Sequence, residues 1–505
     1  MSEQPYSLEP ARRGLKHFAI GRVLVGLAGV VLLLLTIRRL SPNDLGSYVS
    51  LVALQEIVSL SSSVGLFGFV QRYMPEYRIH GSRRQLAVAI GFSLVGRVIT
   101  LALACGVLYL VAGELTAFLG LPVQTDMFRL YLLVILLEGS GRFIDHVFEA
   151  LLMQGATQIA NLVRSLVKLG GLLVLVGGWE WTLNDIIVWD VYASSVALVV
   201  ASVALWAGVR AQPDVLQRGE FDHSTMVRFA AYNYAALLGY QIYGFDTLKL
   251  LVSKLIGVAE TAAYGLSQSV TDVLRRYLPA NLLLGMIRPL IIASYSHTRN
   301  MDRPLFLANL VLKLNVFLIA PALAVFIALG DPLLELIGKG RYPQAYGYVL
   351  AFMVLLVVQT LHLMLSVLAM TAERNELVMK GTWFAITGAV VAVTTIPTLG
   401  AWGALAAAFV SEFAFCLVVS RGLRNVCEMH VLLWREFDIL AAIFAVTVLV
   451  GVLVAMTLPK GMIALFIGTP LVVGSFFVMA QIWKPFTVAE STLINKLLPK
   501  PFFIW

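Results

Sequence analysis

The residues of this sequence best suited to chemistry are charged side chains inside apolar segments. Asp246 and Lys249 lie one helical turn apart in one apolar run, and Arg275 and Arg276 lie deep within the next. A charge at membrane depth is costly unless it faces water or another charge, so such residues are functional candidates. Their chemistry would be the binding of ions, because the sequence shows no paired catalytic carboxylates, metal-ligand spacing or nucleophile motif.

Further cations stand inside other apolar runs, namely Arg22, Arg97, Arg142, Arg164 and Lys168. Arginine and lysine both bind phosphate, and arginine can do so through two parallel hydrogen bonds. The set could line a wet cavity that accepts an anion, or it could pair with acids of neighbouring helices. Arg22 is the clearer ligand candidate, because its own run holds no acid at helical spacing.

One apolar run concentrates charges of both signs on a single helical face: Glu138, Arg142, Asp145, His146 and Glu149. Steps of three and four residues bring such side chains within reach of one another. Arg164 and Lys168 form a complementary cationic stripe on the next run. These residues could form a salt-bridge network or line the wall of a cavity, and the sequence leaves both interpretations open. His146 is expected to belong to such a network rather than to act as a proton relay.

Three acids are candidates for coupling transport to an ion. Asp246 could bind sodium or exchange a proton, unless it pairs with Lys249; Asp190 and Glu412 are secondary candidates. Asp272, one turn before Arg275, is expected to neutralise one of the two adjacent arginines.

Composition places these charges in a membrane protein. Hydrophobic residues make up 59% and charged residues 13%, about half the roughly 25% charge of a soluble domain. Apolar runs of bilayer length recur along the chain and leave no room for a sizeable soluble domain. The three cysteines show no disulfide or metal spacing.

The pattern predicts an all-α polytopic protein with about fourteen spans. They cover residues 17–37, 46–70, 87–112, 128–150, 158–178, 183–209, 228–252, 260–285, 306–329, 346–370, 376–397, 400–420, 436–457 and 461–482. Loops after even-numbered spans carry most basic residues, among them Arg72, Arg78, Arg83, Arg84, Arg210, Arg218, Arg228, Arg288, Arg299, Arg303, Arg421, Arg424 and Arg435. The positive-inside rule therefore explains the net charge of +8 without nucleic acid and places both termini in the cytoplasm, with Trp179, Trp181 and Trp402 at the outer interface.

The chain also repeats itself at a nearly constant spacing. Leu40 matches Leu255, Tyr48 matches Tyr264, Arg72 matches Arg288, Met153 matches Met370, and Gly113-Glu-Leu matches Gly330-Asp-Pro-Leu. Six spans per repeat make the halves parallel about an axis along the membrane normal, with a cavity between them. The predicted division is a first lobe at 1–209, a second lobe at 210–420, and two further spans with a tail at 421–505. Coincidence among apolar helices is the alternative.

Three short motifs carry a resemblance to a known superfamily. They are Arg39-Leu-Ser-Pro-Asn-Asp-Leu-Gly-Ser-Tyr after the first span, Arg72-Tyr-Met-Pro-Glu after the second, and Ala263-Tyr-Gly opening the eighth. With two parallel six-span lobes, the chain resembles the polysaccharide transport branch of the multidrug/oligosaccharidyl-lipid/polysaccharide (MOP) flippase superfamily over nearly its whole length. Fourteen spans are similar to its lipid-handling members, whereas twelve are common among its drug transporters.

The resemblance implies a transporter of the bacterial inner membrane and no enzyme. Its substrate would be an oligosaccharide linked to undecaprenyl pyrophosphate, turned from the cytoplasmic to the outer leaflet by alternating access for exopolysaccharide, O-antigen or capsule synthesis. Arg22, Arg275 and Arg276 would recognise the pyrophosphate, with Lys249 nearby. No cofactor is expected beyond coupling to Na⁺ or H⁺, and the expected partners are membrane lipids, a polysaccharide polymerase and glycosyltransferases.

Two other functions stay open: a cation-coupled drug antiporter of the same architecture, and a membrane assembly partner without transport activity. Pro279 and Gly285 could let span eight bend, or mark a static kink. The last two spans could form a groove for a lipid tail or simply a packing pair.

Overall fold

The chain is helical throughout the part that the structure describes. A computed structural model describes residues 8–176, 180–212, 223–282, 301–427, 437–459 and 461–497, with Ile291 and Tyr295, and these ranges contain no strand. Within them, nine helices are long and apolar enough to cross a membrane, or ten if one bent pair is a single span. The predicted fold class, an all-α polytopic membrane protein, is confirmed. Trp179, Arg218, Gly285, Arg288, Arg299 and Arg435 lie outside the described residues.

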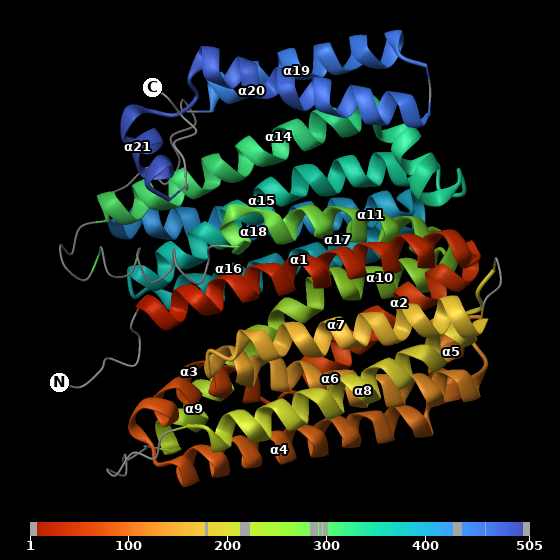
Figure 1. Cartoon of the computed structure of the whole chain (residues 1–505), viewed down its shortest axis with the longest axis vertical. Coiled ribbons are helices and arrows are strands. Elements are labelled where there is room, and N and C mark those ends of the chain that lie inside the picture. The colour runs from red at the N-terminus through yellow and green to blue at the C-terminus, as the bar shows by residue number, and fades with distance from the viewer. Residues whose placement is uncertain are drawn as a thin grey trace. The chain divides into compact units, whose positions relative to one another are not determined.

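Each predicted span coincides with a helix or a broken helix (Figure 1). The elements up to the middle of the chain are α1 (Leu8–Arg39), α2 (Pro42–Ser61), α3 (Leu66–His80), α4 (Arg83–Leu110), α5 (Ala112–Phe118), α6 (Thr125–Ala150), α7 (Gln154–Gly171), η1 (Leu172–Val176), α8 (Leu183–Arg210), α9 (His223–Tyr243) and α10 (Phe245–Leu255). The later elements are α11 (Val258–Tyr277), α12 (Pro279–Leu282), α14 (Asp302–Gly338), α15 (Ala345–Thr371), α16 (Asn375–Ala385), α17 (Thr387–Leu399), α18 (Ala401–Cys427), α19 (Asp438–Thr457), η3 (Ala464–Gly468), α20 (Thr469–Trp483) and α21 (Val488–Leu497).

Local sequence explains where several helices begin. The Ser-Pro-Asn-Asp motif starts α2: the Ser41 hydroxyl accepts a hydrogen bond from the Asp44 amide at 3.1 Å, and Pro42 occupies the first turn. Ser82 with Gln85 and Thr182 with Asp185 form capping boxes at α4 and α8. These side chains satisfy amide groups that a helix leaves without partners at its start.

Several predicted spans are broken rather than continuous among the described residues. Span two bends by 58° between α2 and α3, where Gly65 has a φ of 80°. The predicted span 228–252 coincides with two helices, because Gly244 adopts an extended conformation between α9 and α10. The Thr247 hydroxyl compensates by donating to the Gln241 carbonyl at 2.6 Å. Span eight breaks at Pro279, as the sequence predicts.

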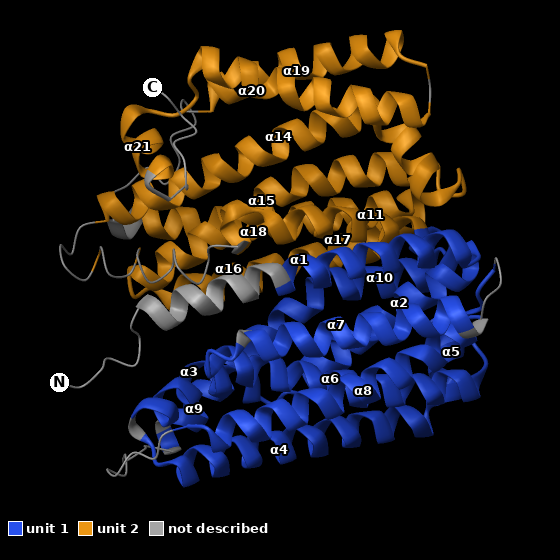
Figure 2. Cartoon of the chain, in the orientation of Figure 1, with its two compact units in different colours: residues 1–262 blue, residues 263–505 orange. Residues whose placement is uncertain are grey.

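The helices divide into two compact units, residues 1–262 and 263–505 (Figure 2). Helices α9 and α10, which follow the predicted first lobe, pack in the first unit against α3 and α2. Lys254 of α10 also donates to the carbonyl of Phe118 at the end of α5, at 2.6 Å. A Cβ atom at Gly46 would lie only 1.7 Å from the carbonyl oxygen of Val258, so α2 approaches this segment as closely as glycine allows. The lobe boundary between residues 209 and 210 stays a prediction.

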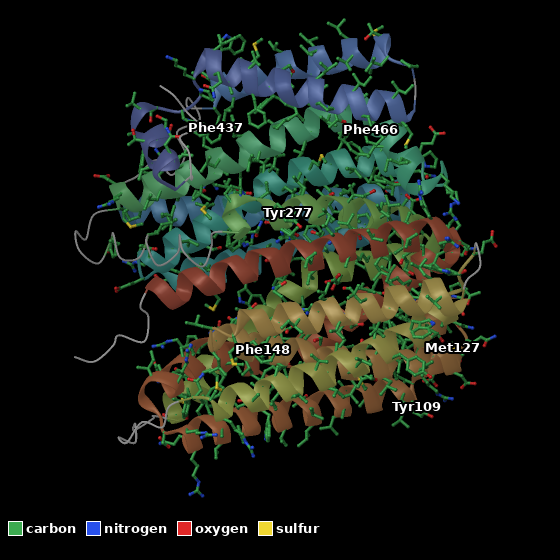
Figure 3. All side chains as sticks on the ribbon, viewed as in Figure 1. Tyr109, Met127, Phe148, Tyr277, Phe437 and Phe466 are labelled. Carbon is green, nitrogen blue, oxygen red and sulfur yellow. The ribbon has the colours of Figure 1, made fainter. Side chains whose placement is uncertain are left out.

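Each unit has its own apolar core. In the first, Phe143, Phe148 and Val147 of α6 pack among α3, α4 and α8. In the second, α19 and α20 pack on one another and on α14, around Phe317 and Phe476. The last two predicted spans therefore pack on one another, and the groove for a lipid tail stays a prediction. Large apolar side chains such as Tyr109 and Phe466 also point away from the helices (Figure 3), as lipid-facing surfaces require.

Candidate anion-binding site

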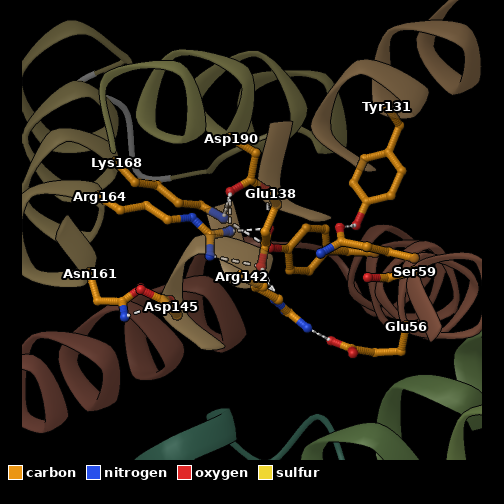
Figure 4. Close-up of polar contacts among 12 residues, drawn as sticks. Glu56, Ser59, Tyr131, Glu138, Arg142, Asp145, Asn161, Arg164, Lys168 and Asp190 are labelled. Atoms are coloured by element: carbon orange, nitrogen blue, oxygen red, sulfur yellow. Dashed lines mark hydrogen bonds and ion pairs between the residues drawn. The ribbon is translucent and has the colours of Figure 1, made fainter. Parts of the chain in front are cut away.

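Six charged residues of the first unit form one continuous set of ion pairs, here called the α6–α7 charge network. It consists of Glu56 on α2, Glu138 and Arg142 on α6, Arg164 and Lys168 on α7, and Asp190 on α8 (Figure 4). The helical spacing predicted the contacts within α6 and with α7. The network confirms ion pairing for Arg142, Arg164 and Lys168.

Glu138 is the centre of the network. Its carboxylate accepts from Arg142 Nη2 at 2.6 Å and from Arg164 Nη1 at 2.8 Å. Only 6% of the Glu138 side chain is exposed. A buried carboxylate is tolerated in such a place because two guanidinium groups replace its water.

Lys168 and Asp190 close the buried end of the network. Lys168 Nζ lies 2.6 Å from Asp190 Oδ1. The Tyr48 hydroxyl donates to Asp190 Oδ2 at 3.0 Å and accepts from Lys168 Nζ at 2.9 Å. Both charges are enclosed in this structure, so Lys168 as a phosphate ligand and Asp190 as an ion-coupling acid would each require these helices to separate.

Arg142 forms the accessible end of the network. About a third of its side chain, 38%, is exposed, and its Nη1 donates to the carboxylate of Glu56. Glu56 was not among the predicted site residues, although it is the one acid within the predicted span 46–70. Arg142 is thus a partly exposed cation of the network, and its role as an anion ligand stays a prediction.

Arg97, one of the predicted cavity cations, is buried between helices in this structure, and its role as a ligand stays a prediction. Its side chain is fully buried, donates to Ser59 Oγ at 2.8 Å and to Ser62 Oγ at 3.0 Å, and lies over the Phe67 ring. In the described residues it has no carboxylate partner. Hydroxyl bonds and ring contact hold this cation between α2 and α4, and a phosphate could reach it only if α2 moved away.

Lys249 and Arg275, two further predicted ligands, also lie beside acids of their own helices. Lys249 Nζ donates to Asp246 Oδ1 at 2.9 Å. Arg275 Nη1 lies 3.9 Å from Asp272 Oδ1, a longer contact than that of Lys249 with Asp246. It confirms the predicted pairing of Asp272 with one of the two adjacent arginines. Each acid reduces the net charge that the neighbouring cation presents.

Arg22 lies half-buried on α1 of the first unit, while Arg275 and Arg276 lie on α11 of the second. Their convergence on one pyrophosphate stays a prediction. At the neighbouring position, Gly21 packs directly on Gln158, so α1 lies close to the helix that carries Arg164.

Two histidines contact acids. His146 lies 3.2 Å from Glu149 on its own helix, and both are partly exposed. In the second unit, His362 lies 2.6 Å from Glu412. No group of three His, Cys, Asp or Glu side chains is arranged to hold a metal ion among the described residues.

No protein-family model matches the sequence, and no curated protein matches it either. Solved structures do match the fold. The lipid II flippase MurJ in an inward closed conformation is similar with a TM-score of 0.68 and 11% identity, over 92% of this chain and 98% of that one.

Two other transporters match less of the chain. An inward-facing multidrug resistance MATE transporter of the MOP superfamily gives a TM-score of 0.58 at 14% identity, covering 81% of this chain and 94% of that one. A MOP superfamily transporter from Pyrococcus furiosus gives a TM-score of 0.51 at 14% identity, covering 82% of this chain and 93% of that one. The chain therefore has the fold of the MOP superfamily transporters, as its motifs indicated.

Proposed function

We propose that this protein is a flippase that moves a polyprenyl-pyrophosphate-linked oligosaccharide from the cytoplasmic to the outer leaflet of the bacterial inner membrane. The product would supply polysaccharide synthesis outside the cell, with a polymerase and glycosyltransferases acting in the same pathway. The proposal rests on one observation above others: a partly exposed arginine inside a membrane helix, held by a carboxylate from a second helix.

A pyrophosphate can replace that carboxylate. Arg142 offers guanidinium N–H groups in the planar fork that suits phosphate oxygens. In the structure Glu56 accepts from Nη1 of Arg142, and Glu138 accepts from Nη2 and Nε of the same side chain. A phosphate oxygen could therefore take the place of Glu56 while the rest of the network keeps Arg142 in position.

This exchange would couple binding to movement. Glu56 lies on α2 and Arg142 on α6, so their contact ties the two helices together. A ligand that displaces Glu56 binds better to a state in which α2 is released, and such a difference in affinity is what shifts a conformational equilibrium. Arg22, Lys249, Arg275 and Arg276 are further proposed ligands of the same anion.

A cation-coupled drug antiporter is the second candidate, because multidrug transporters share the fold. A cationic drug would need an acid that is available to it. In the described part of the first unit, Glu56, Glu138, Asp190 and Asp246 each contact an arginine or lysine, whereas Asp145 accepts from the side-chain amide of Asn161 at 3.3 Å. The pairing of these four acids with cations favours an anionic substrate.

Reconstitution of the purified protein in liposomes would test the proposal. Liposomes would carry a fluorescent polyprenyl-pyrophosphate saccharide, and transfer between leaflets would be followed by its accessibility to an impermeant quencher. We expect the wild type to accelerate transfer and Arg142→Gln to slow it. Arg129→Gln is the matched control, because Arg129 pairs with Asp126 at the exposed end of the same helix.

The same vesicles would be tested for uptake of a cationic dye. Dye transport without lipid transfer would replace the flippase proposal by the antiporter. Equal loss of lipid transfer in the Arg142→Gln and Arg129→Gln proteins would show that Arg142 has no special role.

A further inference from the structure

A buried arginine of the first unit adjoins the contact between Glu56 and Arg142 but takes no part in it. Arg97 of α4 is 0% exposed, and its Nη2 donates to Ser59 Oγ of α2 at 2.8 Å. Its Nη1 donates to Ser62 Oγ at 3.0 Å, and its Nε is buried with no hydrogen-bond acceptor among the described residues. Because buried charges are normally paired with an opposite charge, Arg97 keeps the capacity to bind a carboxylate.

The end of helix α2 explains why this cation is tolerated without a carboxylate. Ser62 is the C-cap of α2, and the carbonyl groups at a helix C-terminus carry about half a negative charge. The ring centroid of Phe67 on α3 lies 5.3 Å from Cζ of Arg97 and adds a cation–π contact. These groups compensate only part of a full charge, so a carboxylate within reach would bind Arg97 more strongly than a neutral hydroxyl does.

The other cations buried among the described residues are already paired with carboxylates. Lys168 Nζ lies 2.6 Å from Asp190, and Lys313 Nζ lies 2.9 Å from Glu490. A further carboxylate could bind either lysine only in competition with the one already present. Arg97 differs from both, because it can accept a carboxylate without first losing one.

Glu56 is placed to provide that carboxylate. Glu56 and Ser59 lie three residues apart on α2 (Figure 4), and such residues are neighbours on a helix surface, with Cβ atoms about 5–6 Å apart. On α6, Gly139 and Arg142 have the same separation. A Cβ atom at Gly139 would lie 3.3 Å from Arg97 Nη2 and 3.5 Å from Ser59 Oγ. On both helices, therefore, the Glu56–Arg142 contact is one turn away from the Arg97–Ser59 contact.

Glu56 would also need a second partner during transport. Among the described residues its carboxylate is bonded to Arg142 alone, and 26% of its side chain is exposed. In the proposed function a pyrophosphate displaces Glu56 from Arg142, which leaves an unpaired carboxylate beside a newly bound anion. An unpaired charge at membrane depth is costly, and two like charges at close range repel one another.

We propose that Arg97 is a positioning residue that receives Glu56 when the pyrophosphate displaces it from Arg142. The trigger of this exchange rests on the proposed function, but the ability of Arg97 to bind a released Glu56 does not. Before the exchange Glu56 ties α2 to α6, and after it Glu56 ties α2 to α4, where the Ser59 bond already joins the two helices. The new ion pair offsets part of the cost of displacing Glu56. Arg97 thus raises the affinity for the anionic lipid without contacting it.

The first test detects the exchange without any substrate. Arg142→Gln removes the partner of Glu56, which should then pair with Arg97. We expect Arg97→Gln to lower the melting temperature in lipid nanodiscs by about 2–4 °C more in the Arg142→Gln protein than in the wild type. This additional loss should vanish when Glu56→Gln is also present. An equal effect of Arg97→Gln in all three backgrounds, or an additional loss that persists without Glu56, would overturn the proposal.

Arg78→Gln is the matched control for this test. Arg78 is a partly buried arginine of the same unit, and its Nη1 donates to the carbonyl of Leu151 at 2.7 Å. Because a backbone carbonyl holds it, its substitution should lower the melting temperature equally in the three backgrounds. The same dependence on background in Arg78→Gln as in Arg97→Gln would show a general loss of packing and contradict a specific exchange.

The second test measures the affinity of nanodisc-embedded protein for a polyprenyl-pyrophosphate saccharide. Arg97→Gln should weaken binding about tenfold when Glu56 is present and less than about twofold in the Glu56→Gln protein, since one charge-assisted hydrogen bond is at stake. Arg97→Lys keeps the charge and should recover most of the affinity, as a purely structural role of the guanidinium would not. A tenfold loss in both backgrounds would show that Arg97 contacts the lipid itself, and no loss in either would show that it receives nothing; each result would overturn the positioning role.

A wild type that does not bind this lipid would refute the proposed function instead. The melting temperatures would then decide by themselves whether Arg97 binds a released Glu56.

Discussion

At the scale of single residues, substitutions of Arg142 and Glu56 should change lipid binding in opposite directions. In the proposed function Glu56 competes with the substrate for Arg142, so Glu56→Gln should tighten binding of the pyrophosphate lipid. Arg142→Gln should remove a charge-assisted contact of ~1.5–3 kcal/mol, which is roughly ten- to a hundredfold in affinity. Both effects can be measured by titrating nanodisc-embedded protein with the lipid and with inorganic pyrophosphate. If Glu56→Gln weakened binding as much as Arg142→Gln, the pair would be purely structural.

Arg22 and Arg275 give a second prediction at this scale. Each is expected to contact the pyrophosphate, so Arg22→Ala and Arg275→Ala should each reduce lipid transfer at matched membrane abundance. Lysine at either position should restore the charge but not the bidentate geometry, and activity should recover only in part. Full transfer by both alanine variants would limit the site to the α6–α7 charge network.

At the scale of elements, α21 is bound to α14 by a buried ion pair. Lys313 Nζ donates to Glu490 Oε2 at 2.9 Å, and both side chains are 3% exposed. The same carboxylate accepts from the Thr487 amide at 2.8 Å and so caps α21. Phe486, just before α21, packs on Phe317 of α14.

Glu490→Gln should therefore destabilise the second unit by about 3–5 kcal/mol, because the buried Lys313 would lose the carboxylate that compensates its charge. Adding Lys313→Met should recover most of this loss, since glutamine can still cap the helix. Thermal unfolding in detergent would measure both proteins. A double variant as unstable as Glu490→Gln alone would show that the lysine charge is not the cause.

The close approach of α2 and Val258 gives another prediction for an element. An alanine at Gly46 would place its Cβ 1.7 Å from the Val258 carbonyl oxygen, so Gly46→Ala should force these segments apart and lower the melting temperature. Gly91 of α4 is the control, because a Cβ there meets nothing within 4 Å. Gly91→Ala should be neutral or stabilising, by up to about 1 kcal/mol. Equal destabilisation by both substitutions would contradict the packing described.

The elements also show what sequence reasoning can reach. Within the described residues, hydropathy located the long helices, and helical spacing predicted the pairs Asp246–Lys249 and Glu138–Arg142, because both depend on neighbours along one helix. It did not find Glu56, His362 or the contact of α21 with Lys313. Those partners lie 86, 50 and 177 residues away in sequence, and no local pattern encodes such distances. The break at Gly244 was missed for a related reason, since one glycine within an apolar run is compatible with a continuous helix.

At the scale of the whole molecule, the distribution of basic loops predicts the orientation. A cysteine at Glu180 should react with an impermeant thiol reagent added outside intact cells, whereas a cysteine at Arg218 should react only after the membrane is opened. The two loops follow spans five and six, so they must lie on opposite sides. Reversed labelling would invert the orientation and with it the direction of transport.

The central claim is that this chain moves an anionic lipid-linked sugar across the membrane with Arg142 as a ligand. Its most direct test is the initial rate of leaflet transfer of a polyprenyl-pyrophosphate saccharide in liposomes that contain wild type, Arg142→Gln or Arg129→Gln protein. We predict rapid transfer by the wild type and Arg129→Gln, and a rate at least about tenfold lower for Arg142→Gln. Transfer at the rate of protein-free liposomes in all three samples would contradict the account.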